Sequence, residues 1–186
     1  MLMHKNIRLA ALLLWLALGA PTWAGQARWV LVDTETRTLT VLSETDQTLD
    51  RFNNISVGRG GVAPLHYHGE ETTPLGDYRI IRIRPSDRFN TFFELDYPTP
   101  EHAEMAVEGG QLDADSYDAI VAARLAHHLP PQDTVLGGRI GIHGVGRGDG
   151  EVHSEYDWTE GCIALTNSQL RRFAHWAKVG MRVVIR

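Results

Sequence analysis

Short runs in which apolar and polar residues alternate, each closed by a turn of glycine, proline or polar residues, recur along most of the chain. The first two runs lie in RWVLVDTETRTLTVLSE and flank a polar turn from Asp33 to Arg37, which predicts a hairpin. Further strands are expected in the stretches FNNISVGRGG, EETTPLGDYRIIRIRP, NTFFELDYP and the terminal MRVVIR. Because strands of this kind bury one face, the chain is predicted to be mostly β-sheet.

Helical spacing of apolar residues occurs in two places. From Asp113 to Leu129 apolar residues recur every three or four positions, acidic residues stand at the start, and two prolines follow. A second helix is expected from Gln169 to Lys178, before Gly180. The sequence therefore predicts a mostly β fold, either a β-sandwich or a partly closed barrel, with one or two helices.

The first 24 residues have the layout of a secretory signal peptide. Lys5 and Arg8 precede an apolar run that ends in Pro21 and small residues up to Ala24. An uncleaved anchor is the alternative, but an apolar run of about 12 residues is shorter than the roughly 20 that span a bilayer. We therefore expect cleavage after Ala24, a periplasmic domain at 25–186 and no transmembrane span.

Charge and composition exclude some classes of partner. The formal net charge is −5 and charges of both signs are interspersed, without the basic tract typical of nucleic-acid binding. No internal repeat or low-complexity linker divides the chain. We expect a single monomeric domain that binds no nucleic acid.

Cys162 is the only cysteine of a chain that is predicted to be exported, so it has no internal partner for a disulfide. An intermolecular disulfide, a buried thiol and a reactive nucleophile are the three alternatives. Gly161 would let the backbone approach a substrate and offer amide N–H groups for an oxyanion hole, and Thr159 supplies a nearby hydroxyl. His143, at the end of the stretch IGIHG, could act as the base for the thiol. A buried thiol with an unrelated core histidine explains the same residues equally well.

The sequence around these residues resembles the L,D-transpeptidases with a YkuD catalytic domain. That family carries a histidine, a spacer, and then Ser or Thr, His, Gly and Cys, and here His143, the spacer 144–158 and TEGCI align with it. The strands WVLVD and LTVLS, the segment TTPLGDYRI and the terminal strand also match. Glu160 replaces the second histidine and Ala164 replaces a common Asn or Arg, as in a divergent branch of the family.

The resemblance implies roles for individual residues. Cys162 would be the nucleophile, His143 its base, and the carbonyl of Gly144 the group that orients the base. The contributions of Glu160 and Asp157 stay open, since carboxylates next to a thiolate raise its pKa unless they pair with a cation.

The resemblance also implies the reaction. The donor would be a peptidoglycan stem tetrapeptide, cut after its diamino acid so that D-alanine leaves and a thioester forms on Cys162. An amine of another stem, or of a lipoprotein, would then attack the thioester, in cell-wall building and cell shape. The thioester conserves the energy of the cleaved peptide bond, which matters outside the cytoplasm, where no ATP is present. If water attacks, the protein is a hydrolase or amidase, and a non-catalytic periplasmic domain that binds peptidoglycan or a metal is the third alternative.

Several other side chains are candidates for binding substrate. We select Trp158, His68 and Arg82, although Trp158 fits ordinary core packing equally well and a strand arginine is more often simply exposed. The stretch HYHGE could form a metal site with His143, His153 and Cys162, but no zinc-ligand spacing completes it. We therefore expect a substrate-facing loop or a solvated turn there, and neither a metal nor another cofactor.

Overall fold

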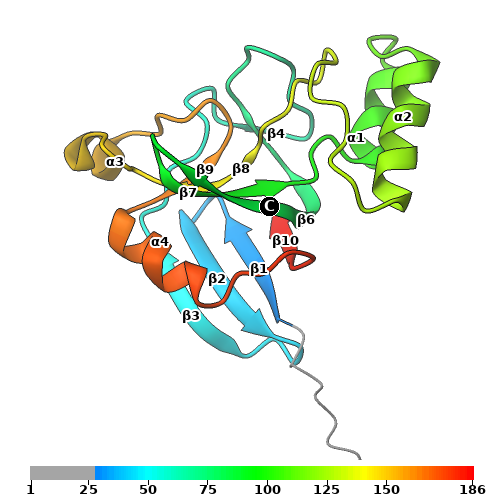
Figure 1. The fold of residues 1–186 in the computed structure, drawn as a ribbon. Helices are drawn as coiled ribbons and strands as arrows, with labels where there is room; N and C mark the ends of the chain where they lie inside the picture. Colours follow the sequence, from blue (N-terminus) through cyan, green and yellow to red (C-terminus); the bar gives the residue numbers. More distant parts are fainter. Residues whose placement is uncertain (1–27) are drawn as a thin grey trace, which may run out of the picture.

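The computed structural model describes residues 28–186, and the predicted signal peptide at 1–24 lies outside the described residues. The described chain forms an eight-stranded mixed sheet, a two-stranded sheet and four helices (Figure 1). The elements are β1 Arg28–Asp33, β2 Thr38–Ser43, β3 Thr48–Asn53, β4 Val62–Ala63, β5 Thr73–Pro74, β6 Gly76–Ser86, β7 Asn90–Leu95, α1 Pro100–Glu108, α2 Ala114–Leu125, β8 Gly141–Gly144, α3 Gly150–Glu155, β9 Ile163–Leu165, α4 Asn167–Ala174 and β10 Arg182–Ile185. The mostly β prediction is confirmed.

The order of strands in the large sheet is β3-β2-β1-β10-β6-β7-β8-β9. Strands β1 and β2 form the predicted hairpin, with Arg28 opposite Ser43 and Asp33 opposite Thr38. Strand β10 lies parallel to β1 and antiparallel to β6, so the end of the chain joins the opening hairpin to the centre of the sheet. Strands β8 and β9 are parallel neighbours at the other end of the order.

The sheet curves so that its two ends approach each other. The chain that follows β3 returns to β9, where Ser56 and Ala164 exchange backbone hydrogen bonds of 3.1 and 2.8 Å. Phe173 of α4 packs edge-on against Phe52 of β3 and against Phe93 of β7, two strands that are far apart in the sheet order. Helix α4 thus fills the space inside the curve.

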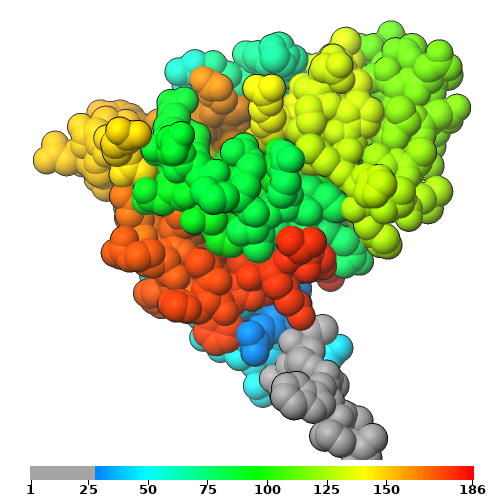
Figure 2. Space-filling view, in the orientation of Figure 1, coloured from blue at the N-terminus to red at the C-terminus, as the bar shows by residue number. Residues whose placement is uncertain are grey.

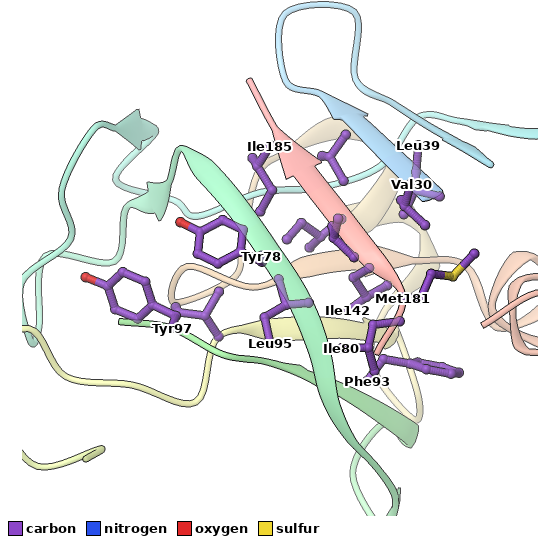
Figure 3. Packing of buried hydrophobic residues seen from close by; sticks show 14 of the residues in the cluster. Val30, Leu39, Tyr78, Ile80, Phe93, Leu95, Tyr97, Ile142, Met181 and Ile185 are labelled. Carbon is purple, nitrogen blue, oxygen red and sulfur yellow. The ribbon is translucent and has the colours of Figure 1, made fainter. Parts of the chain in front are cut away.

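Apolar side chains from both halves of the sheet form one continuous core (Figure 3). Val30 and Leu39 of the hairpin, Ile80 of β6, Leu95 of β7 and Ile142 of β8 are all fully buried in it. The alternating pattern of the sequence supplies these residues, because every second side chain of a strand points to the same face. This core fixes β8, which carries a predicted functional residue.

The four described helices are more than the one or two expected. Helix α2 begins after Asp113, whose carboxylate accepts the Ser116 amide at 2.8 Å, and α4 begins after Thr166, close to their predicted starts. Helix α1 is an addition to the predicted elements, and it begins at Pro100, shortly after the expected strand NTFFELDYP. A proline in the first turn of a helix removes an N–H that has no helical partner, so Pro100 begins α1 without loss of a hydrogen bond.

Helices α1 and α2 lie together at one side of the sheet and form the projecting green and yellow-green lobe of the surface (Figures 1 and 2). Helix α3, also not predicted, is a single short helix on the opposite side of the molecule. Within residues 28–186 no helix has the length and apolar character needed to span a bilayer.

Candidate active site

Of the two predicted catalytic residues, His143 lies on β8 and Cys162 lies directly before β9, the parallel neighbour of β8. His143 is on β8, where it pairs in register with Ala164 of β9, and Cys162 stands two residues before Ala164. Residues two apart on a strand point to the same face. His143 and Cys162 therefore face the same side of the sheet, and both line one cleft.

His143 is held in an aromatic enclosure. Phe89 stacks on its ring with centroids 4.0 Å apart. The ring centroid of Phe92 lies 5.9 Å from that of His143, and the ring centroid of Trp158 lies 5.8 Å away in a T-shaped pair. Its Nδ1 lies 2.8 Å from the carbonyl oxygen of Gly144, which can only accept a hydrogen bond. The proton of the neutral ring is therefore on Nδ1, and Nε2 keeps its lone pair.

The environment keeps the imidazole of His143 neutral at physiological pH. His143 is only 2% exposed, and this burial lowers the pKa of its imidazole to about 4. The hydrogen bond to Gly144 raises this pKa, whereas the nearby guanidinium of Arg88 lowers it. A neutral imidazole with a free Nε2 is suited to accept a proton.

The thiol of Cys162 is also neutral in the resting site. Burial raises its pKa to about 12, the backbone of Gly141 opposes this by hydrogen bonding, and the charges of Glu160 and Glu94 raise it further. The thiol donates to the carbonyl oxygen of Arg139 at an S–O distance of 3.3 Å. The free cysteine of the described chain is partly exposed to the cleft, so a substrate can reach it.

The turn before Cys162 is fixed by close backbone contacts. Gly161 has φ +119°, and a Cβ there would lie 2.7 Å from the carbonyl oxygen of Thr72, so only glycine fits. The Thr159 hydroxyl donates to the Cys162 carbonyl at 2.6 Å and accepts the Gly161 amide at 3.2 Å. The Gly161 N–H is therefore occupied in this conformation, and Thr159 braces the turn.

The cleft that contains both residues has a volume of about 1080 Å³. Its walls come from the segment around β4 and β5, the β6–β7 hairpin, the segment before β8 and the turn before β9. The lining residues are His66, His68, Gly69, Glu71, Arg84, Ser86, Arg88, Phe89, Phe92, Gln132, Asp133, Thr134, Val135, Gly138, Arg139, His143, Trp158, Thr159, Glu160 and Cys162.

The predicted binding residues have different positions. Trp158 and His68 line the cleft, and the indole N–H of Trp158 donates to Nδ1 of His153 at 3.2 Å. Arg82 is not among the lining residues, and its guanidinium pairs with the carboxylate of Glu94 at 2.6 Å. Arg84, two positions further along β6, reaches the cleft instead.

The two carboxylates near the cysteine have separate surroundings. Asp157 accepts the Val57 amide at 3.0 Å and pairs with Arg37 at 3.3 Å, so it ties the turn to the segment after β3. Glu160 is exposed, lines the cleft and contributes negative charge near Cys162. Within residues 28–186 no group of three or more His, Cys, Asp or Glu side chains is arranged to hold a metal ion.

Sequence reasoning did not identify several residues that surround the two predicted catalytic residues. Phe89 and Phe92 enclose the ring of His143. The carbonyl oxygen of Arg139 accepts the hydrogen bond of the thiol. Glu94 is a carboxylate that is only 1% exposed and lies beside two arginines. A single charged residue inside the apolar run TFFEL was the one sequence signal for Glu94. The aromatic residues look like ordinary core positions in the sequence.

The two pKa values predict how the thiol reacts with iodoacetamide. Because only thiolate is alkylated and its pKa is raised, the thiolate fraction should grow about tenfold for each pH unit between about pH 6 and pH 9. His143 stays neutral over this range and adds no inflection. Stopped-time mass spectrometry of the alkylated protein measures the rate. A rate that is already constant from about pH 5 would show a thiolate–imidazolium pair and contradict this reading.

Comparison with known proteins identifies the family to which the chain belongs. Residues 27–185 match the YkuD family model, which describes the L,D-transpeptidase catalytic domain. No curated protein matches the chain significantly.

Several solved structures are similar in fold. The helical cell shape determining protein Pgp2 from Campylobacter jejuni is 22% identical with a TM-score of 0.58, and the match covers 87% of this chain and 48% of that one. Bd1075 from Bdellovibrio bacteriovorus is 15% identical with a TM-score of 0.54, covering 87% and 47%. An L,D-transpeptidase from Mycobacterium smegmatis is 12% identical with a TM-score of 0.51, covering 87% and 59%. The chain thus spans roughly half the length of these proteins, and the likeness is one of fold.

Proposed function

The chain belongs to the YkuD family of L,D-transpeptidase catalytic domains, and on that premise we propose that it is a cysteine-dependent L,D-transpeptidase that acts on peptidoglycan stem peptides. The observation that carries the proposal is the placement of Cys162 and His143 on one face of the β8–β9 pair, inside a single cleft. A thiol and a neutral imidazole in one cleft are the parts needed for nucleophilic acyl transfer.

Acylation begins with proton removal. Nε2 of His143 takes the thiol proton as the sulfur of Cys162 attacks a carbonyl carbon of the stem peptide. This carbonyl belongs to the peptide bond that follows the diamino acid. The tetrahedral intermediate then collapses, the C–N bond breaks, and His143 returns the proton to the leaving amine of D-alanine. The Nδ1–H bond to Gly144 keeps the ring oriented during both transfers and stabilises the imidazolium that forms between them.

For this attack the thiol must exchange partners. In the resting site its hydrogen bond goes to the carbonyl of Arg139, and rotation about the Cα–Cβ bond of Cys162 would turn the S–H toward His143. A pKa of about 12 means that free thiolate is scarce at pH 7. The attack therefore needs a base, and the thiol gives up its proton only as it attacks a bound substrate.

Three arginines of the cleft fit a donor that carries carboxylates, although Glu71, Asp133 and Glu160 also line the cleft. Arg84, Arg88 and Arg139 line it, and Arg84 lies over the Phe92 ring at 4.7 Å. Guanidinium groups recognise carboxylates through paired hydrogen bonds, and stem peptides carry several carboxylates. Arg84 and Arg88 thus take the binding role that was predicted for Arg82, alongside Trp158 and His68.

The proposal extends to the acceptor of the acyl group and to the compartment in which the protein works. A thioester conserves the energy of the cleaved amide, so an amine of a second stem or of a lipoprotein can form the new bond without ATP. Cleavage after Ala24 would deliver the domain at 25–186 to the periplasm, where it works as a monomer without a cofactor. The similarity in fold to Pgp2, a helical cell shape determining protein, supports a role in cell shape.

Mass spectrometry of muropeptides incubated with the protein tests this function. We expect new cross-linked products that depend on Cys162, with D-alanine released. Shortened stems without cross-links would assign the same thioester to hydrolysis, which is the alternative activity on this scaffold. Unchanged muropeptides, together with an unreactive thiol, would contradict the proposal and favour a non-catalytic binding domain.

A further inference from the structure

A second imidazole lines the cleft and is not used in the acylation described above. His66 lies in the segment between β4 and β5 and is only 4% exposed. Its Nδ1 lies 2.8 Å from the carbonyl oxygen of Thr72, so Nδ1 carries the proton of the neutral ring. Among residues 28–186 no group is hydrogen-bonded to its Nε2.

The ring is firmly positioned. The hydroxyl of Tyr97 donates to the backbone carbonyl of His66 at 2.6 Å, and the two rings meet edge to face with centroids 5.8 Å apart. Because Nδ1 is turned to Thr72, Nε2 is the nitrogen that a molecule in the cleft can reach. Burial lowers the pKa of His66, so Nε2 is an unprotonated acceptor at neutral pH.

This imidazole lies beside the turn that carries the nucleophile. A Cβ built at Gly161 would be 3.5 Å from Cε1 of His66 and 2.7 Å from the carbonyl oxygen of Thr72. Gly161 directly precedes Cys162, whereas His143 approaches the cleft from β8. His66 and His143 therefore reach the cleft as neutral imidazoles from two separate elements.

We propose that His66 is a second catalytic base, which takes the proton of the amine or water that attacks the thioester on Cys162. This inference rests on the proposed function and assigns the deacylation half of that reaction. His143, enclosed by aromatic rings, would serve the leaving amine during acylation, and His66 would serve the entering nucleophile.

The step is balanced in atoms and charge. The nitrogen or oxygen of the nucleophile bonds to the thioester carbonyl carbon while its proton passes to Nε2 of His66. The resulting oxyanion collapses, the C–S bond breaks, and sulfur leaves as the thiolate. His66 then releases its proton to solvent and the thiolate takes one up, which restores both neutral groups.

p-Nitrophenyl acetate separates the two halves of the reaction with a simple acyl group. Its burst of nitrophenolate measures acetylation of Cys162, and the steady rate that follows measures hydrolysis of the acetyl thioester. The informative variant is His66→Asn, whose side-chain N–H can still donate to the Thr72 carbonyl but which has no basic nitrogen in the place of Nε2. His128→Asn, at an exposed position after α2, is the matched control.

We expect His66→Asn to keep the burst within about twofold and to lose about 10²-fold in the steady rate, as for removal of a general base. Free imidazole should restore part of that loss. A steady rate like that of the unmodified protein, or equal losses in burst and steady rate, would overturn the role of His66 and leave the thioester function intact. Absence of a burst from the unmodified protein would instead contradict the thioester function on which the inference rests.

Discussion

Replacing His143 with alanine should lower the rate of Cys162 acylation by about 10³-fold, within the range that general-base catalysis contributes. The reason is the raised pKa of the thiol, about 12, which leaves little thiolate at pH 7 without a nearby proton acceptor. The burst phase with p-nitrophenyl acetate, followed by intact mass of the acetylated chain, measures this rate.

Loss of the buried ring could also disturb the fold, so a second variant separates the two effects. His143→Asn keeps an N–H that can donate to the Gly144 carbonyl but lacks Nε2, and it leaves a smaller gap beside Phe89 than alanine does. Both variants should lose acylation, while the thermal midpoint of His143→Asn stays closer to that of the unmodified protein. Acylation at the original rate in a folded His143→Asn variant would remove His143 from the mechanism.

Replacing Cys162 with serine should abolish the acyl-enzyme and lower turnover by at least about 10³-fold. A serine hydroxyl is far less acidic than a thiol, and a base adapted to a thiol activates it poorly. The side chain differs by one atom, and the turn is held by Thr159 and Gly161, so the fold should be kept. Retained turnover in Cys162→Ser would mean that another residue carries the acyl group.

Much of the sheet could be predicted because its signals are local. The opening hairpin follows from alternation on both sides of the Asp33–Arg37 turn, and the presence of α4 follows from its apolar spacing, although the helix ends at Ala174 and not at the predicted Lys178. The insertion of β10 between β1 and β6 is a contact between the two ends of the chain, and no local pattern encodes it. Helix α3, six residues long, is too short to display a periodicity.

The site shows the same division. The motif predicts Cys162 and His143 as the catalytic pair, and the parallel register of β8 and β9 explains why both line one cleft. The stretch HYHGE, which contains His66, was expected near the substrate, but the stacking of Phe89 on His143 could not be predicted, because Phe89 reaches that ring from the β6–β7 turn only after folding. Arg82 shows the limit of reading a strand face from sequence, since its pairing with a buried glutamate depends on the neighbouring strand.

The central claim is that Cys162 carries a stem peptide as a thioester, and a rapid acid quench of the protein with disaccharide-tetrapeptide muropeptides tests it most directly. Intact-protein mass spectrometry should show one adduct, with the mass of the muropeptide less one alanine, which peptide mapping places on the segment GCIALTN. The adduct should be absent from Cys162→Ser and should accumulate in His66→Asn. Release of alanine without any adduct on Cys162, or an adduct on another residue, would contradict the account.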